Sequence, residues 1–88
     1  MNVATSASFK RAFRKRIQKS SEVTERFYTC AEWFMTDPFD PRLRTHKLSG
    51  ELGELWSFSV TFDIRVIFYF MAKDKAVFID IGSHDDVY

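Results

Sequence analysis

Residue types that carry disulfide or metal chemistry are scarce in this chain. It has a single cysteine, Cys30, so no internal disulfide can form, and a reducing compartment is expected. Cys30 falls in a helical apolar pattern and is predicted to be a small core residue. Only two histidines accompany it, and these three residues show no zinc-site spacing and do not make a credible metal site. We therefore expect a protein that uses no metal or other cofactor.

Long apolar runs, nucleotide-cofactor motifs and net charge are also missing. No segment approaches ~18 consecutive apolar residues, and no secretory leader pattern opens the chain, so a cytoplasmic protein without a membrane span is expected. There is no P-loop, dinucleotide fingerprint or nucleophile elbow. The 13 Lys and Arg residues nearly balance the 12 Asp and Glu residues, for a net charge of +1.

The cations are nevertheless clustered along the chain. The first cluster lies within residues 10–19 and includes Arg11 and Arg14, and the second consists of Arg42, Arg44 and Lys47. Either cluster suits contact with phosphate or with an acidic partner protein. The first cluster is equally consistent with a solvated helix face.

Apolar and aromatic residues are abundant. The 88 residues are 45% hydrophobic and 17% aromatic and include ten Phe. A chain of this size buries only roughly 60–65% of its unfolded surface, so its core must be apolar and compact. We predict a single globular domain over residues 1–88.

Two apolar stripes with helical spacing occupy the first half of the chain. Phe9, Phe13 and Ile17 recur every four residues after a candidate N-cap at Ser8. A second stripe runs over residues 23–34 after a candidate cap at Ser20 or Ser21. The Asp37-Pro38 pair ends it, because the residue before Pro avoids helical backbone, and residues 39–45 are predicted to be an extended connection. The two stripes predict an antiparallel helical hairpin.

The second half of the chain changes to strand periodicity. Strands are predicted at residues 56–61, 64–71 and 76–81, with a shorter one at residues 46–48 and 52 and a possible first strand at residues 3–5. Short turns between them favour a mostly antiparallel sheet of about four strands. With the helical hairpin on one face, the fold class is α+β.

The strand at residues 64–71 is apolar on both faces and is predicted to be central. One helical layer covers only one of its two rows of side chains. The other row, Arg65, Ile67, Tyr69 and Met71, is either covered by the chain ends or exposed as a binding surface. Arg65 either pairs with Asp63 or Asp80 or faces an anion.

The last seven residues, Gly82 to Tyr88, follow a buried strand with a glycine, a histidine, an acidic pair and a tyrosine. They are either a polar cap on the sheet or a segment that handles RNA. His46, Arg65, His84 and Tyr88 could converge at one end of the sheet. A proton acceptor, a cation, a proton donor and a stacking ring are the groups that metal-free RNA cleavage requires.

The order and spacing of four segments resemble the RelE/ParE superfamily of bacterial type II toxin–antitoxin toxins, most closely its YafQ/RelE-like mRNA interferase branch. The segments are residues 46–50, 55–58, 63–68 and 79–88, which read HKLSG, LWSF, DIRVIF and IDIGSHDDVY. The resemblance covers about half of the chain, and the helical hairpin fits it more loosely. It implies a toxin that cuts mRNA in the ribosomal A site and a cognate antitoxin that binds it in a hetero-oligomer.

The resemblance also implies roles for particular residues. Arg65 matches an arginine that stabilises the transition-state phosphate, and Tyr88 matches a terminal aromatic residue that stacks on or orients a base. His46 corresponds to a general base and His84 to a general acid. Asp63 matches an acid that orients a histidine or pairs with Arg65.

The chain also departs from the family pattern. Ser59 stands near a second histidine of YafQ-like members, Asp80 stands near an arginine, and RelE has lysines near Ser57 and Ser59. Fewer cations weaken phosphate attraction. The activity is therefore either slow or dependent on docking to ribosomal RNA through Arg11, Arg14, Arg42, Arg44 and Lys47. The alternatives are a ParE-like protein that inhibits DNA gyrase by binding and a decayed toxin that only binds its antitoxin.

Overall fold

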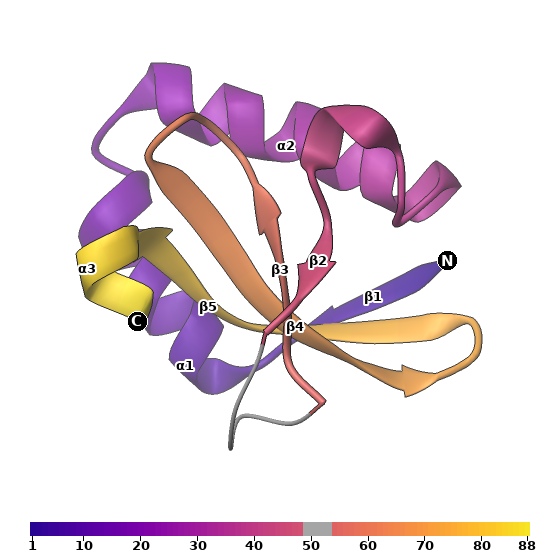
Figure 1. Ribbon diagram of the computed structural model, residues 1–88. Helices are drawn as coiled ribbons and strands as arrows, with labels where there is room; N and C mark the ends of the chain where they lie inside the picture. The colour runs from indigo at the N-terminus through magenta and orange to yellow at the C-terminus, as the bar shows by residue number, and fades with distance from the viewer. Residues whose placement is uncertain (49–53) are drawn as a thin grey trace.

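The computed structural model describes residues 1–48 and 54–88, which form a five-stranded sheet with its two longest helical segments on one face (Figure 1). The elements in chain order are β1 (Asn2–Thr5), α1 (Ala7–Ala12), the π-helical turn η1 (Phe13–Ile17), α2 (Ser21–Thr36), the 3₁₀ turn η2 (Pro41–Leu43), β2 (His46–Lys47), β3 (Trp56–Ser59), β4 (Ile64–Ala72), β5 (Lys75–Ser83) and α3 (His84–Val87). This confirms the predicted α+β class.

The strand order across the sheet is β1-β5-β4-β3-β2. Every neighbouring pair is antiparallel except β1 and β5, which run parallel. Five strands form rather than about four, because the short strand β1 pairs with β5 and the two-residue strand β2 pairs with β3. The expected contribution of Leu52 to a strand lies outside the described residues.

The predicted helices form, but α1 begins earlier than expected. Its N-cap is Ser6 rather than Ser8: the Ser6 Oγ accepts a hydrogen bond from the Phe9 amide at 3.1 Å, while the Ser8 Oγ donates to the Ile79 carbonyl at 2.8 Å. Ser6 qualifies because its backbone is still extended, as an N-cap requires. Helix α2 is capped by Ser20 and ends at Thr36, immediately before Asp37-Pro38, as predicted.

We had expected an extended connection at residues 39–45, but this prediction was wrong for residues 41–43, which form the 3₁₀ turn η2. The Asp40 side chain accepts a hydrogen bond from the Arg42 amide at 2.9 Å and caps the 3₁₀ turn η2. The turn closes at Arg44, whose backbone is left-handed at φ 53° and ψ 41°. Residues other than glycine seldom adopt the left-handed backbone conformation. At Arg44 this conformation ends the 3₁₀ turn two residues before β2 begins.

An aromatic core holds the helices on the sheet. Phe34 from α2 contacts Phe58, Phe68 and Phe78 from three adjacent strands, with ring centroids 5.0–5.2 Å apart, and all four side chains are buried. Such tight packing fixes the relative positions of the strands. The residues on the opposite face of the sheet are therefore presented on a rigid support.

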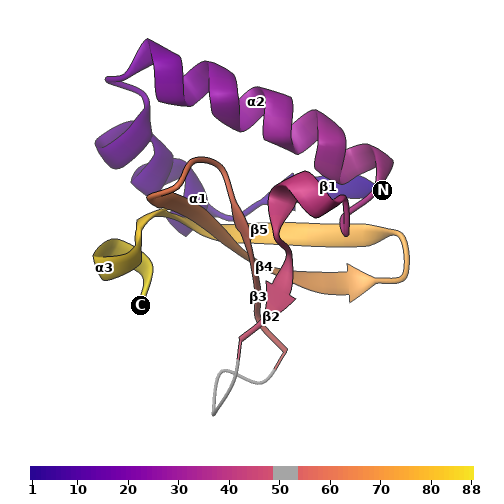
Figure 2. The same cartoon turned by 45° about the horizontal axis from the view of Figure 1, so that its top comes forward.

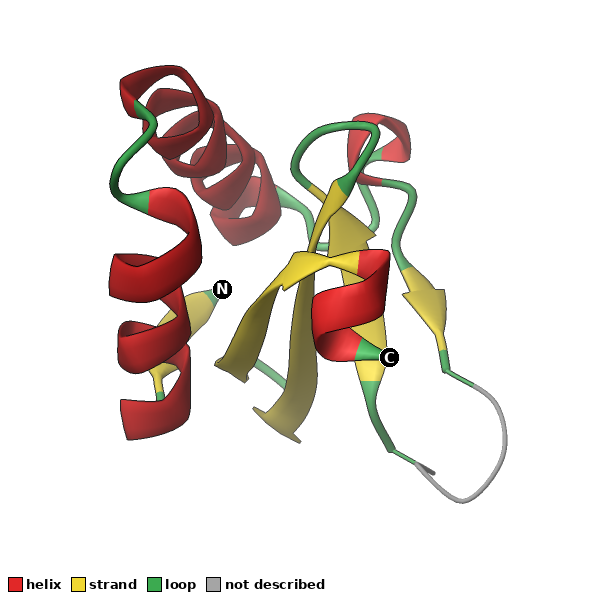
Figure 3. Ribbon diagram, turned by 90° about the vertical axis from the view of Figure 1, so that its left-hand side faces the viewer, coloured by secondary structure: helices red, strands yellow, loops and turns green. Residues whose placement is uncertain are grey.

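The opposite face is partly covered by the C-terminus. Helices α1 and α2 lie on one side of the sheet, while α3 lies on the other side and packs on β4 and β5 (Figures 2 and 3). Ile67 in the second row of β4 is buried, but Met71 at the far end of the strand is 55% exposed. The second row of β4 is therefore buried at Ile67 and exposed at Met71.

Candidate functional site

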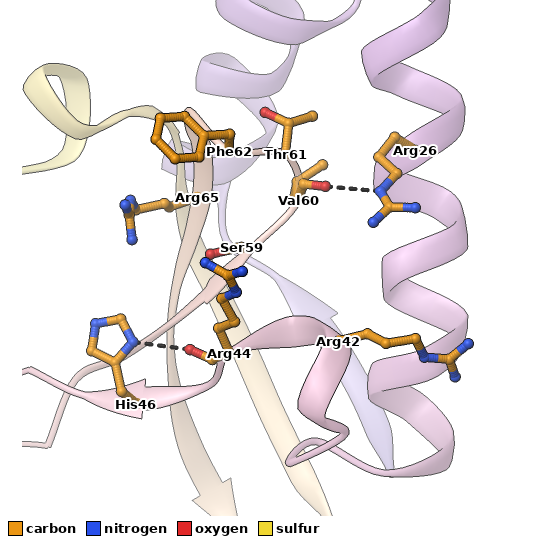
Figure 4. A pocket seen from close by; sticks show the side chains of 9 residues that line it. All are labelled: Arg26, Arg42, Arg44, His46, Ser59, Val60, Thr61, Phe62 and Arg65. Atoms are coloured by element: carbon orange, nitrogen blue, oxygen red, sulfur yellow. Dashed lines mark hydrogen bonds between the residues drawn. The ribbon is translucent and has the colours of Figure 1, made fainter.

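A cavity of about 410 Å³ opens beside the β3–β4 turn, between the end of η2, β3 and β4 (Figure 4). Its described lining contains four arginines and one histidine but no carboxylate. The lining residues are Arg26, Arg42, Arg44, His46, Ser59, Val60, Thr61, Phe62 and Arg65. Clustered cations in a concave site favour an anionic ligand.

Arg65 enters this cavity from β4, where its strand neighbours are Ser59 on β3 and Gly82 on β5. The side chain is half-buried, and its buried Nε atom has no hydrogen-bond partner among the described residues. Asp80 instead pairs with Arg16, with Nη1 and Oδ1 3.0 Å apart. Arg65 thus forms no ion pair with Asp63 or Asp80 in the described chain, and the other alternative, an arginine that faces an anion, stays a prediction. A buried polar group without a partner is costly unless a ligand satisfies it.

His46 is oriented by the backbone of Arg44. Its Nδ1 atom lies 3.0 Å from the Arg44 carbonyl oxygen. A carbonyl only accepts hydrogen bonds, so in the neutral ring Nδ1 carries the proton and Nε2 keeps its lone pair. The left-handed backbone at Arg44 directs this carbonyl, and the arrangement makes Nε2 a proton acceptor beside the cavity (Figure 4).

Two further arginines are held in place by a tryptophan. The Arg42 guanidinium lies 3.8 Å from the centre of the Trp33 ring and binds Asp40 at 2.8 and 3.1 Å. Arg26 lies 5.0 Å from the same ring and donates from Nε to the Val60 carbonyl at 3.0 Å. The side-chain hydrogen bond from Arg42 lowers the pKa of Asp40 to about 2. Both arginines are thus pre-ordered at the cavity wall.

The C-terminal segment begins later than predicted, because Gly82 and Ser83 still belong to β5, and His84–Val87 form a single turn of helix, α3. Ser83 and Asp86 form a reciprocal capping box at its start. The hydrogen bonds from Ser83 to the carboxylate are the main cause of the lowered pKa of Asp86. The rings of His84 and Tyr88 meet edge to face at 4.7 Å, and both are exposed. The capping box therefore positions the imidazole and the phenol as one unit.

Gly82 allows α3 to lie directly against the sheet. A Cβ atom at this position would lie 2.7 Å from Asp86 Cβ and 2.9 Å from Asp86 Oδ2. Arg65 is the neighbour of Gly82 on β4. The close approach therefore places the helix that carries His84 and Tyr88 next to the strand that carries Arg65.

The remaining predicted residues are spread more widely. Asp63 lies in the β3–β4 turn, where its amide donates to the Thr61 Oγ1 at 3.2 Å. Its carboxylate has no hydrogen bond or ion pair to a histidine or to Arg65 within the described chain. Lys47 is exposed on β2, whereas Arg11 and Arg14 are exposed on α1 and η1 and do not line the cavity.

Sequence reasoning assigned only four of the nine lining residues to the site, and the missed residues include Arg26 and Phe62. Arg26 is seven residues beyond Lys19, the end of the first basic cluster, and reaches the cavity only because α2 packs over β3. Phe62 had a visible signal, since it is an apolar residue between Thr61 and Asp63 in a turn.

Comparison with known proteins gives a family and a fold. The model of a family described as the bacterial toxin of type II toxin–antitoxin systems, YafQ, matches residues 1–88. No curated protein matches the chain. No helix in residues 1–48 and 54–88 is long and apolar enough to cross a membrane.

Solved structures of similar fold include the following three. YafQ from E. coli strain BL21(DE3) has a TM-score of 0.82 at 13% identity, with 99% of this chain and 97% of that chain covered. The YoeB/ParE toxin from Agrobacterium tumefaciens has a TM-score of 0.78 at 15% identity, with 96% and 99% covered. A structure of the E. coli DinJ–YafQ complex has a TM-score of 0.73 at 14% identity, with 99% and 97% covered.

Proposed function

This chain belongs to the YafQ family of bacterial toxins of type II toxin–antitoxin systems, and we propose that it is an endoribonuclease that cleaves mRNA in the ribosomal A site. The observation that carries the proposal is the acid-free cavity that joins Arg65 to His46. Arg65 has a buried Nε without a described partner, and the His46 ring presents Nε2 as an acceptor. A phosphodiester supplies both an anion for the arginine and a 2′-hydroxyl proton for the histidine.

The proposed reaction is attack of the 2′-oxygen on the adjacent phosphorus. Nε2 of His46 accepts the 2′-hydroxyl proton, and the Arg65 guanidinium neutralises charge on the crowded phosphate. His84, exposed at the first turn of α3, protonates the departing 5′-oxygen. Tyr88 stacks on or orients a base beside it, and its ring contact with His84 couples the two positions. Asp63 is close to this region in sequence and is proposed to act by its charge.

Docking on the ribosome is proposed to use the exposed cations around the site. Arg42, Arg44 and Lys47 lie on the η2–β2 segment beside the cavity, and Arg11 and Arg14 form a second exposed basic pair on α1 and η1. Phosphate contacts of this kind supply affinity without base specificity. In this proposal the exposed basic residues position the protein on the ribosome, and the cavity residues carry out the cleavage.

A cognate antitoxin is the proposed protein partner. The E. coli structure with a TM-score of 0.73 is that of YafQ in complex with DinJ. We propose that this chain likewise forms a hetero-oligomer with an antitoxin that blocks the cavity or its surroundings.

The test is the toxicity of catalytic variants expressed without an antitoxin. His46→Gln and Arg65→Gln should abolish growth arrest, since loss of one positioned acid–base group costs roughly 10²–10⁴ in rate. Circular dichroism should show that both variants fold. Growth arrest that survives both substitutions and is accompanied by a DNA-damage response would favour the ParE-like alternative. No growth effect of the wild type, with antitoxin binding intact, would indicate a decayed toxin.

A further inference from the structure

Phe62 is the most exposed large apolar side chain in the described part of the protein. It is 96% exposed, whereas the other exposed large apolar residues range from 43 to 57%. The ring stands at the β3–β4 turn and contributes to the wall of the cavity (Figure 4). It therefore contributes little to the core and is free to contact a ligand.

The turn that carries Phe62 is rigid. Thr61 Oγ1 accepts hydrogen bonds from the amides of Asp63 at 3.2 Å and Ile64 at 3.0 Å. The amides of Val60 and Thr61 both donate to the Ile64 carbonyl, at 2.8 and 3.2 Å. A phenylalanine has only two side-chain torsions, so a ring on such a turn loses little conformational freedom on binding.

The charged residues around the Phe62 ring indicate which kind of ligand would bind there. Phe62 shares the cavity wall with Arg26, Arg44 and Arg65, and no carboxylate is present in the described wall. An apolar protein segment would have to desolvate these guanidinium groups without pairing them, which is costly. A ligand that combines a flat ring with negative charge satisfies both the aromatic ring and the cations, and a nucleotide has this combination.

We infer that Phe62 is a stacking platform for a base of single-stranded RNA whose phosphate binds Arg65. Arg65 lies on β4 three residues after Phe62, and its neighbour Gly82 on β5 supports the helix that carries Tyr88. The phosphate site thus lies between two aromatic positions, one on the β3–β4 turn and one on α3. Two successive bases would stack on Phe62 and Tyr88. This inference rests on the proposed function, because it names how the same site holds its RNA.

The binding test uses a trinucleotide that contains 2-aminopurine and carries 2′-deoxy sugars, so that it cannot be cleaved. The fluorescence of 2-aminopurine is quenched when it stacks on an aromatic ring. With 2-aminopurine at the base position assigned to Phe62, Phe62→Leu should weaken binding roughly 5- to 150-fold, as expected for loss of one base–aromatic stack, and should sharply reduce the quenching. Phe62→Tyr should retain both. Phe39→Leu is the matched control, because Phe39 is 53% exposed but does not line the cavity.

Equal quenching and affinity in wild type and Phe62→Leu would overturn the inference, as would the absence of any binding by the wild type. Weaker antitoxin binding by Phe62→Leu, with trinucleotide binding unchanged, would also overturn it and make Phe62 a protein contact. Cleavage of ribosome-bound mRNA separates this inference from the proposed function. Phe62→Leu should raise KM more than it lowers kcat. Phe62-dependent binding without any wild-type cleavage would contradict the proposed nuclease alone.

Discussion

A methyl group added at Gly82 tests whether close docking of α3 assembles the site. In Gly82→Ala the new Cβ atom would lie 2.7 Å from Asp86 Cβ, 2.9 Å from Asp86 Oδ2 and 3.1 Å from Arg16 Cδ. The Arg16 side chain can move aside. Asp86 cannot simply rotate, because its carboxylate accepts hydrogen bonds at 3.0 Å from both the amide and the hydroxyl of Ser83. Helix α3 must therefore shift.

The expected loss of activity is larger than the loss of stability. An extra methyl group in a tight contact costs about 1–3 kcal/mol, and a single turn of helix can relieve part of this by moving off the sheet. The melting temperature should fall by roughly 4–8 °C for each kcal/mol in a domain of this size. A displacement of about 1 Å at a catalytic group can cost about 10²-fold in rate. The assays are thermal unfolding and cleavage of ribosome-bound mRNA.

A double-mutant cycle with Asp86→Gly provides the control. Asp86→Gly removes both atoms that the new methyl group would strike in α3, at the expense of the capping box. In that background, Gly82→Ala should have little further effect on the melting temperature or on cleavage, so the two changes should be strongly non-additive. Full activity of Gly82→Ala on its own, or simple additivity of the two substitutions, would refute the steric argument.

Three other perturbations test separate parts of the structure. Arg44→Gly should keep the left-handed backbone and the Nδ1–H tautomer of His46, whereas Arg44→Val should lose that tautomer, as read from the ¹⁵N shifts of the ring. Hydrogen bonding to Arg42 depresses the pKa of Asp40 from 3.8 to about 2, so its stabilising effect is present above about pH 4 and is lost as the pH falls towards 2. Between pH 6 and pH 2 the melting temperature of Asp40→Asn should therefore fall less steeply than that of the wild type. Burial raises the pKa of the Cys30 thiol, so Ellman's reagent should modify it only in denaturant, and rapid modification of the native protein would contradict a core role.

Helices α1 and α2 and strands β3, β4 and β5 were predictable, because burial of one side of each element leaves a regular spacing of apolar residues in the sequence. Phe27, Cys30 and Phe34 all reach the core from one face of α2, as their spacing indicated. The start of α1 was not predictable in this way, since both Ser6 and Ser8 are acceptable caps. The parallel pairing of β1 with β5 decides between them, because it leads to a hydrogen bond of 3.0 Å from the Ser6 amide to the Phe78 carbonyl.

Short elements and converging side chains were harder to foresee. Helix α3 has four residues, too few for a period, although Ser83 followed three residues later by Asp86 is a local capping signal. The left-handed backbone of Arg44 could not be predicted from the sequence, because arginine does not favour that conformation. That Arg26 and Arg65 line the same cavity depends on how α2 packs over the sheet, and such long-range packing is not visible in sequence spacing.

The most direct test of the proposed nuclease maps cleavage of a defined mRNA by primer extension. Purified protein is added to ribosomes stalled at a known codon, with the naked mRNA and the Arg65→Gln variant as controls. The account predicts cuts within the A-site codon that require both the ribosome and Arg65. Intact mRNA in the presence of folded wild-type protein, or equal cleavage by Arg65→Gln, would contradict it.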